Sequence, residues 1–392
     1  MLRPVQQTTR DLRRHNRSAL LSRLYLHGPG SRLELMHASG LSSATVSNVI
    51  SDLINDGMVA EAGSVDSDGG RPRTLLRVRG DFAQVVGVDI GETHVQVGLF
   101  DCTLETLKLA TYPIADTHLE PESVARLVID GITAVTDGTD PADLLGVGVG
   151  VPGAVRSDGL VYAPTLQWAG VPLVPMLRPH IEAPLYVDNC ARTLGQAEMW
   201  RGAGRDADRA VIALLGVGVG AAVATGSDSY RLATSTTSEW GHTVVQVGGE
   251  ACRCGSRGCL EAYIGAEAIL ERYGKKFDAD DTESRMAELV AKSATSKAAR
   301  EAVAETAEYL GIGVANLVNL LSPDRVVLSG WVSAVLGPAI LPAVRETVRR
   351  HALPYLFVQT EVELGQLGSE EVAMGAATLP VVRLLATGAR PA

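Results

Sequence analysis

Three glycine-rich turns, each beside an apolar strand-like run, most constrain how this 392-residue chain can fold. They lie in QVVGVDIGETHVQVGLFD (84–101), LLGVGVGAAVATG (214–226) and DRVVLSGWVS (324–333). A glycine turn beside a carboxylate between two strands can hold a phosphate and its Mg²⁺ through backbone N–H groups. Strand–turn units spread over most of the chain predict two α/β lobes, with a ligand cleft between them.

The first 79 residues predict a separate helix-turn-helix domain. Apolar residues at helical spacing indicate helices over 13–28, 31–40 and 41–57. The second helix opens with the S-x-x-E spacing of a capping box, and only a few residues separate it from the third. Two short strand-like runs follow, MVAEAG and TLLRVRG, and the segment SVDSDGGRPR joins them as a predicted wing.

Charge and side-chain chemistry point this head toward double-stranded DNA. Residues 1–79 contain 11 Arg, no Lys and 7 acidic residues, a net charge of +4, whereas the rest of the chain carries −14. Short polar side chains on the third helix can contact base edges and phosphates, and arginines on the wing suit a minor groove. The candidate DNA-binding residues are Ser43, Thr45, Ser47, Asn48, Arg71 and Arg73. A unit that serves only dimerisation is the alternative interpretation.

The segment SEWGHTVVQVGGEACRCGSRGCLEAY (238–263) predicts a zinc site. His242, Cys252, Cys254 and Cys259 supply one imidazole and three thiolates, a set suited to tetrahedral Zn²⁺. Four protein ligands close the site, so the metal is expected to order a loop without activating water. No secretory signal is visible, and the uncharged run 210–226 is short for a membrane span, so we expect a cytoplasmic protein with reduced cysteines and no membrane partner.

These motifs resemble those of the ROK family of sugar-responsive repressors and sugar kinases. The resemblance covers nearly the whole chain and rests on GGRP in the wing, GH…C-x-C-G-x-x-G-C-L-E, DIGET, LGVGVGAAVATG and RVVLSGWVS. It implies a winged helix-turn-helix followed by a two-lobed α/β body of actin-like, hexokinase-like (ribonuclease H-like) fold with a zinc loop. The domains implied are 1–79 for the head, 80–200 together with the C-terminal helix 369–387 for the first lobe, and 201–368 for the second lobe.

The resemblance also implies a sugar site and a lost catalytic group. The residues that match the sugar-binding positions of ROK kinases are Asn189, Cys190, Glu239, His242 and Glu261. Cys190 stands where those kinases have the catalytic Asp, and a thiol that stays protonated at neutral pH is a poor general base. Glu92 adds a negative charge to the first phosphate motif, and Trp331 replaces a small residue of the adenosine motif.

The resemblance therefore implies a sugar-responsive transcriptional regulator, a repressor of carbohydrate-metabolism genes, that has no enzymatic activity. We expect a homodimer or homotetramer bound to operator DNA, with a sugar or sugar derivative as effector. The alternatives are an ATP-dependent sugar kinase that carries a DNA-binding head, and a body that receives a partner protein in place of a sugar. The sequence leaves open whether the effector is a hexose, a pentose, a phosphosugar or an oligosaccharide.

Overall fold

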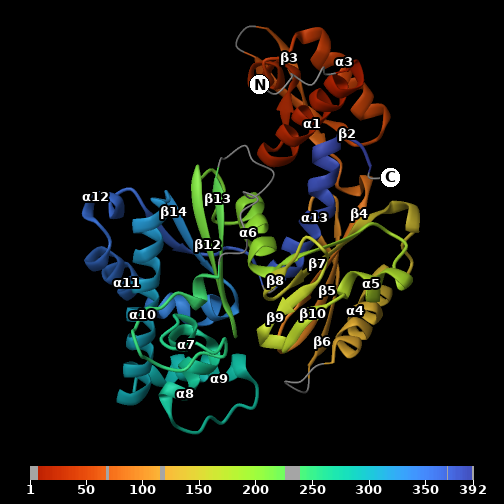
Figure 1. Cartoon of the computed structure of the whole chain (residues 1–392). Helices are drawn as coiled ribbons and strands as arrows, with labels where there is room; N and C mark the ends of the chain where they lie inside the picture. Colours follow the sequence, from red (N-terminus) through yellow and green to blue (C-terminus); the bar gives the residue numbers. More distant parts are fainter. Residues whose placement is uncertain (1–7, 68–69, 115–119, 226–238, 369, 391–392) are drawn as a thin grey trace, which may run out of the picture.

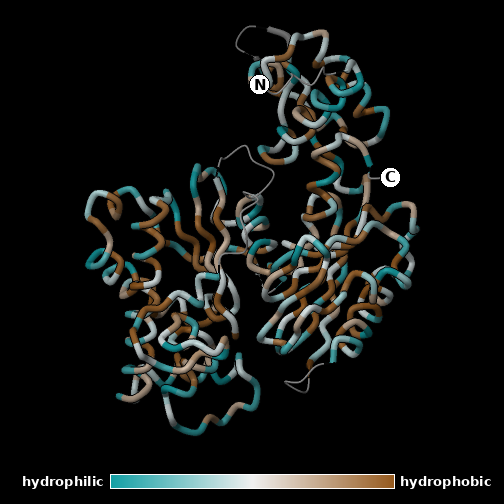
Figure 2. Tube along the Cα trace, in the orientation of Figure 1, coloured by the Kyte–Doolittle hydropathy of each residue, from teal (hydrophilic) through white to brown (hydrophobic). Residues whose placement is uncertain are grey.

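The chain folds into an N-terminal head and two sheet-containing lobes that lie side by side (Figure 1). The structure is a computed structural model, and it describes residues 8–67, 70–114, 120–225, 239–368 and 370–390, without the side chains of residues 67, 70 and 71. Apolar residues fill the interior of each part, while polar residues dominate the outer loops and helices (Figure 2). Among the described residues, no helix is long and apolar enough to cross a membrane.

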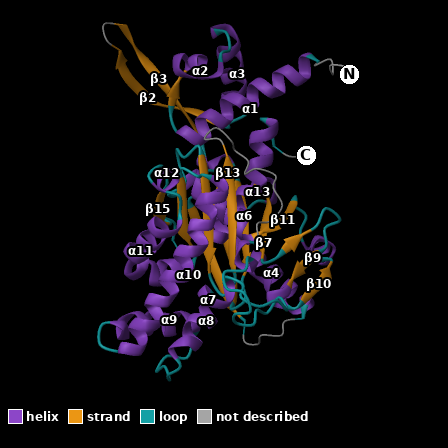
Figure 3. Cartoon of the chain, turned by 60° about the vertical axis from the view of Figure 1, so that its left-hand side comes forward, coloured by secondary structure: helices purple, strands orange, loops and turns teal. Residues whose placement is uncertain are grey.

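The head is a winged helix-turn-helix, which confirms the predicted fold (Figure 3). Its core forms where Leu20, Leu24, Ile50 and Leu53 are fully buried between the helices. Its three strands form one sheet in the order β1-β3-β2, and β2 and β3 make a long hairpin. The elements are α1 (Thr9–His27), β1 (Gly30–Ser31), α2 (Arg32–Ser39), α3 (Ser43–Asn55), β2 (Val59–Ser67) and β3 (Gly70–Val78).

Two boundaries of the head differ from the sequence prediction. The first helix begins at Thr9 because Thr8 and Asp11 form a capping box, in which the Thr8 hydroxyl accepts the Asp11 N–H and the Asp11 carboxylate accepts the Thr8 N–H. Most of the predicted wing loop is strand, because Ser64 pairs with Thr74 and Val65 with Arg73. The wing therefore extends farther from the helices than the sequence indicated.

The first lobe is built on a mixed five-stranded sheet in the order β11-β7-β4-β5-β6. Strands β11, β7 and β4 are parallel to one another, β5 is antiparallel to β4, and the edge strand β6 is antiparallel to β5. Its strands are β4 (Gln84–Ile90), β5 (His94–Asp101), β6 (Thr106–Pro113), β7 (Leu144–Val151) and β11 (Leu185–Asn189), with a small sheet of β8 (Ala154–Val155), β9 (Val161–Ala163) and β10 (Trp168–Val171). Its helices are η1 (Gly80–Phe82), α4 (Pro121–Thr136), η2 (Pro141–Asp143), η3 (Pro164–Leu166), α5 (Leu173–Leu177), η4 (Arg178–His180) and α6 (Cys190–Arg201).

The C-terminal helix α13 (Glu371–Thr387) returns to this first sheet and packs directly on it. A Cβ on Gly87 would lie 1.8 Å from the Ala373 carbonyl oxygen, and one on Gly148 would lie 1.9 Å from that of Ala376. Both strands therefore need glycine where the helix backbone crosses the sheet. The same helix also packs along α6, so α6 and α13 form one layer.

The second lobe contains a four-stranded sheet in the order β13-β12-β14-β15, covered by helices. The strand–turn–strand unit predicted at 214–226 is the β12–β13 hairpin, in its described part. The strands are β12 (Arg209–Leu215), β13 (Val219–Thr225), β14 (Arg325–Ser329) and β15 (Glu361–Leu364). The helices are η5 (Trp240–His242), α7 (Glu261–Ile264), α8 (Ala266–Tyr273), α9 (Thr282–Ser293), α10 (Lys297–Leu321), α11 (Trp331–His351) and α12 (Pro354–Phe357).

The head and the first lobe share one hydrophobic core. Leu20 and Leu24 of α1 belong to the same buried cluster as Trp200 of α6 and Leu384 of α13. The Tyr25 ring meets the Trp200 ring edge to face, with centroids 5.3 Å apart. Because α6 starts at the tip of β11 and ends under the head, it connects the lobe's interior to the head.

Candidate functional site

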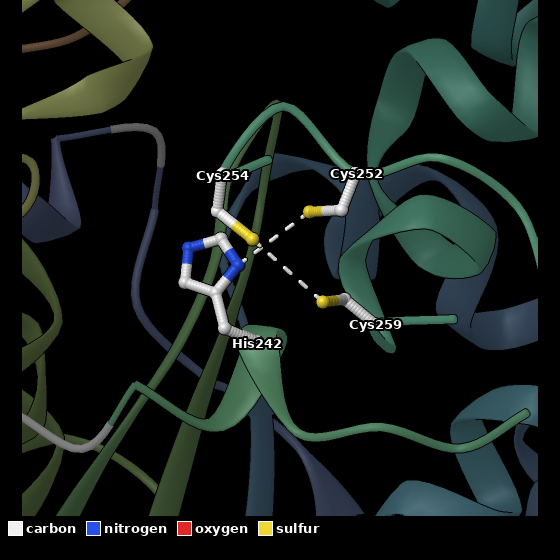
Figure 4. A group of neighbouring side chains, drawn as sticks. All are labelled: His242, Cys252, Cys254 and Cys259. Atoms are coloured by element: carbon white, nitrogen blue, oxygen red, sulfur yellow. Dashed lines mark hydrogen bonds between the residues drawn. The ribbon is translucent and has the colours of Figure 1, made fainter. Parts of the chain in front are cut away.

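His242, Cys252, Cys254 and Cys259 converge at one point, as the sequence predicted (Figure 4). Their ligand atoms all lie within 4.8 Å of one another. The Cys254 and Cys259 sulfurs are 3.8 Å apart, and the Cys252 sulfur is 3.6 Å from Nδ1 of His242. Tetrahedral bonds of about 2.3 Å to sulfur and about 2.0 Å to nitrogen give separations of about 3.8 and 3.5 Å. The four residues can therefore hold a metal ion with this geometry.

The loop that carries the cysteines is fixed to the second lobe. The Tyr309 hydroxyl of α10 donates to the Gln246 side chain at 2.6 Å, and the Tyr263 hydroxyl accepts the Glu250 N–H at 2.8 Å. The two tyrosine rings stack with centroids 4.0 Å apart. Gly258 has φ +77°, and a Cβ there would lie 1.7 Å from the Gln246 carbonyl oxygen, so only glycine permits this fold of the loop.

The tip of β11 places Asn189 and Asp188 in structural roles. The Asn189 side-chain oxygen accepts the N–H groups of Ala191 and Arg192 and so caps α6, while its nitrogen donates to the Gly153 carbonyl at 2.6 Å. Asp188 accepts the Asn189 N–H and forms an ion pair with Arg192 at 3.4 Å. Asp188 is therefore engaged at the start of α6, and the capping role of Asn189 was missed in the sequence.

Cys190 is the first residue of α6 and lies among carboxylates of the first lobe. Burial and the neighbouring Asp89 carboxylate raise the pKa of the Cys190 thiol well above its ordinary value. Burial also raises the pKa of Asp89 to about 7. A thiol with a raised pKa is a poor general base at neutral pH.

Arg253, between the first two cysteines of the loop, joins the two lobes. Its guanidinium donates to Glu92 of the β4–β5 turn at 3.0 Å and to Glu261 at 3.0 Å, and to the Val217 carbonyl at 2.6 Å. The other oxygen of Glu261 accepts the Val219 N–H at 2.9 Å. Glu92, Arg253 and Glu261, which we call the interlobe bridge, were not predicted to interact.

Gly218, in the second glycine-rich turn, lies next to the interlobe bridge and to Thr165 of the first lobe. A Cβ on Gly218 would lie 3.4 Å from the Glu92 carboxylate, 3.7 Å from Glu261 and 3.9 Å from the Thr165 methyl group. Burial raises the pKa of Glu92, and the Arg253 guanidinium opposes this rise. The turn, the bridge and Thr165 therefore form one polar contact region between the lobes.

Some of the predicted sugar-binding residues lie at this contact region, and others lie outside it. Glu261 belongs to the bridge, and Cys190 lies close enough to Glu92 for its charge to act on the thiol. His242 belongs to the metal cluster, and Glu239 is exposed one residue before η5, directly after the undescribed residues 226–238. Glu92 therefore links two of the predicted residues from the two lobes, since it lies near Cys190 in the first lobe and pairs with Arg253, which also holds Glu261 of the second lobe.

The predicted DNA-contacting residues lie on the outer side of the head. Ser43 and Asn48 are exposed on α3, Thr45 and Ser47 are half-buried there, and the Arg73 side chain is exposed on β3. Thr45 also contacts the Ser42 hydroxyl at 2.9 Å as part of the α3 cap. Arg71 lies in β3, and its side chain is outside the described residues.

The comparisons identify the family of this fold and these motifs. The ROK family model matches residues 85–381. The chain belongs to the ROK family. It is 30% identical to the xylose repressor of Caldicellulosiruptor bescii, over 91% of this chain and 92% of that protein. It is also 30% identical to a glucokinase of Halalkalibacterium halodurans, over 74% of this chain and 92% of that enzyme.

A solved ROK structure matches the head and the body together. It is a ROK family transcriptional regulator, described as a homolog of the Escherichia coli MLC protein, with a TM-score of 0.78 and 20% identity. The match covers 96% of this chain and 97% of that chain, so the two share the fold from the winged head to the C-terminal helix. The glucokinase, in contrast, matches a smaller share of this chain than the repressor does.

Proposed function

We propose that this ROK protein is a sugar-responsive transcriptional repressor that binds operator DNA through its head. The observation that carries the proposal is the winged helix-turn-helix packed in one core with a ROK body. The match to a xylose repressor over 91% of the chain supports the same function and makes xylose the first effector to test. Relief of repression would follow if the sugar bound more tightly to a body conformation whose heads fit the operator poorly.

On the DNA side, we propose that α3 enters a major groove and that the wing contacts the neighbouring minor groove. Ser43, Thr45, Ser47 and Asn48 would contact base edges or phosphates, while Arg71 and Arg73 would follow the backbone or the minor groove. A homodimer or homotetramer would place two heads on a two-fold-related site with half-sites a whole number of helical turns apart.

On the ligand side, we propose that a sugar enters between the lobes near Cys190 and Glu261, with Glu239 and His242 on the second-lobe side. Carboxylates supply the acceptors that a polyol needs, and the buried Glu261 is already held in place by Val219 and Arg253. Asn189 would support this site as the cap that fixes the first turn of α6. We propose that the body divides into residues 80–200 with 369–387 and residues 201–368, with the sugar cleft between these two lobes.

We propose that the metal cluster binds structural Zn²⁺. One imidazole and three thiolates in a closed set are the ligands that zinc prefers in structural sites, and the Cys254–Cys259 and Cys252–His242 separations fit a tetrahedron. When bound, the ion would lock the loop that carries Arg253 and Glu261. Metal binding through His242 would also fix the orientation of that imidazole toward the cleft.

We further propose that kinase catalysis is lost. Three features support this: the protonated thiol of Cys190, the Glu92 carboxylate in the first phosphate motif, and Trp331 against the second. The Trp331 indole nitrogen lies 3.4 Å from the position a Cβ would take on Gly216, so the indole covers the turn. An ATP-dependent sugar kinase carrying a DNA-binding head is the second candidate, and the 30% identity to a glucokinase favours it.

Two assays on the full-length protein test the proposed function. Gel shifts with promoter fragments, with and without xylose and a panel of other sugars, should show a preferred site whose occupancy the effector lowers. A coupled ATPase assay with the same sugars should show no turnover. ATP-dependent phosphorylation of any sugar by the natural chain would instead establish the kinase.

A further inference from the structure

The interlobe bridge carries a net negative charge next to the proposed sugar site. Glu92 and Glu261 contribute two carboxylates, and Arg253 contributes one guanidinium. All three nitrogens of that guanidinium already donate, to Glu261, to Glu92 and to the Val217 carbonyl. The side chain of Arg253 is 29% exposed and those of Glu92 and Glu261 are 15% and 5% exposed, so solvent screens these charges only in part.

The cavity beside the bridge has the same sign of charge. Its volume is about 610 Å³, and Arg253, Glu261 and Val217 form one side of it. Five carboxylates and two guanidinium groups line it: Glu250, Glu261, Glu267, Glu271 and Glu305 against Arg253 and Arg272. Arg272 is also engaged, since it forms an ion pair with Glu305 at 3.4 Å and donates to the Thr306 hydroxyl. An anion that approaches from this cavity would meet an excess of negative charge.

We propose that the interlobe bridge makes the cleft selective for an uncharged saccharide, with Arg253 as the positioning residue that holds both carboxylates as hydroxyl acceptors. This inference rests on the proposed function, because it takes the cleft to be the effector site. The sequence leaves open whether the effector is phosphorylated. The proposed selectivity answers this question, since it excludes phosphosugars and nucleotides from the cleft.

The physical reason is the difference between a hydroxyl group and a phosphate. A sugar hydroxyl can donate to Glu92 or Glu261 without adding charge, and Arg253 keeps those oxygens oriented toward the lobe interface. A phosphate monoester brings about two negative charges and finds the guanidinium already shared by two carboxylates. One uncompensated pair of like charges about 5 Å apart, at an effective dielectric constant of about 20, weakens binding by about a hundredfold or more.

The experiment is isothermal titration of the full-length protein with xylose and glucose and with their phosphorylated forms, xylose 5-phosphate and glucose 6-phosphate. We expect the better neutral sugar to bind at least a hundredfold more tightly than its phosphate. Glu92→Gln changes the net charge of the bridge from −1 to zero, so it should narrow that gap by about tenfold or more. Arg253→Gln should lower the affinity for the neutral sugar, and Arg253→Lys should restore it in part.

Arg257→Gln is the matched control, because it removes the same charge from an exposed position of the same loop. Arg257→Gln should leave the affinities for the neutral sugar and for its phosphate unchanged. Thermal unfolding of every variant shows whether a loss of binding comes from a loss of folding. A phosphosugar that binds as tightly as its neutral form, or an Arg253→Gln variant that keeps full sugar affinity, would overturn the inference and leave the repressor function standing. Failure of every neutral and phosphorylated sugar to bind would overturn both the cleft and its selectivity, while operator binding in the same sample tests the head separately.

Discussion

Substitution of Trp200 tests whether α6 transmits the state of the cleft to the DNA-binding head. This indole is 4% exposed and lies in the cluster that the head and the body share. It sits at the end of the helix that Cys190 begins, and its edge-to-face contact with Tyr25 is the aromatic contact between α6 and α1. Trp200→Ala should therefore loosen the head on the body while leaving the cleft residues in place.

The size of the effect follows from burial. Removal of a fully packed tryptophan side chain costs about 3–5 kcal/mol, of which the ring pair accounts for about 0.5–1.5 kcal/mol. In a chain of this size that corresponds to a fall in Tm of roughly 4–6 °C. The matched control is Tyr25→Phe, because the Tyr25 hydroxyl is buried and has no hydrogen-bond partner in the described part of the chain. Its removal should leave stability unchanged or raise it by about 1 kcal/mol.

Fluorescence anisotropy on operator DNA, with and without the effector sugar, measures the coupling. In Trp200→Ala the ratio of operator Kd values with and without sugar should fall toward one, while sugar affinity stays within a few-fold of the natural protein. Tyr25→Phe should keep the full ratio. A Trp200→Ala protein that is folded and still fully sugar-responsive would show that α6 does not couple the two sites.

Three further predictions concern the metal cluster, the buried carboxyl of Glu371 and the thiol of Cys190. Cys259→Ser should abolish stoichiometric zinc, measured by metal analysis, and weaken sugar binding more than operator binding; zinc retained at full stoichiometry would contradict the ligand set. Burial raises the pKa of Glu371 from 4.5 to about 7, so the folded carboxyl keeps a proton that the unfolded chain releases. The free energy of unfolding should therefore fall by up to about 3 kcal/mol between pH 4.5 and 7 through this group, and Glu371→Gln should remove that slope in urea titrations. Cys190→Asp should leave phosphoryl transfer undetectable in the coupled assay, because Glu92 and Trp331 still occupy the nucleotide side; turnover would refute that reason.

Local patterns made much of this structure predictable from the sequence. The four metal ligands lie within 18 residues of one another, and close sequence spacing restricts where their side chains can meet. The helix-turn-helix was predictable for the same reason, because caps and apolar periodicity are properties of single segments. The two-lobed body followed from glycine turns that each belong to one hairpin or one strand end.

What the sequence concealed depends on contacts between distant segments. Arg253 and Glu92 are 161 positions apart in the sequence, so neither segment alone indicates that the two side chains form an ion pair. The available signal was the Arg between two cysteines of the metal cluster, since a cation in a closely folded loop favours a carboxylate partner. We predicted Asn189 only as a sugar ligand. Its capping role becomes recognisable only when the start of α6 at Cys190 is known. The wing was underestimated because Gly and Pro suggested a loop where cross-strand pairing holds the backbone extended.

The most direct test of the central claim, that a sugar controls DNA binding by this protein, is one titration. Full-length protein is added to a labelled promoter fragment that carries the preferred site, and anisotropy is followed with increasing xylose and then with the best sugar from the panel. We predict tight, site-specific binding that the sugar weakens at least tenfold. The account would be contradicted if the protein bound the promoter fragment no more tightly than random DNA. It would also be contradicted if no sugar in the panel changed the affinity for that fragment.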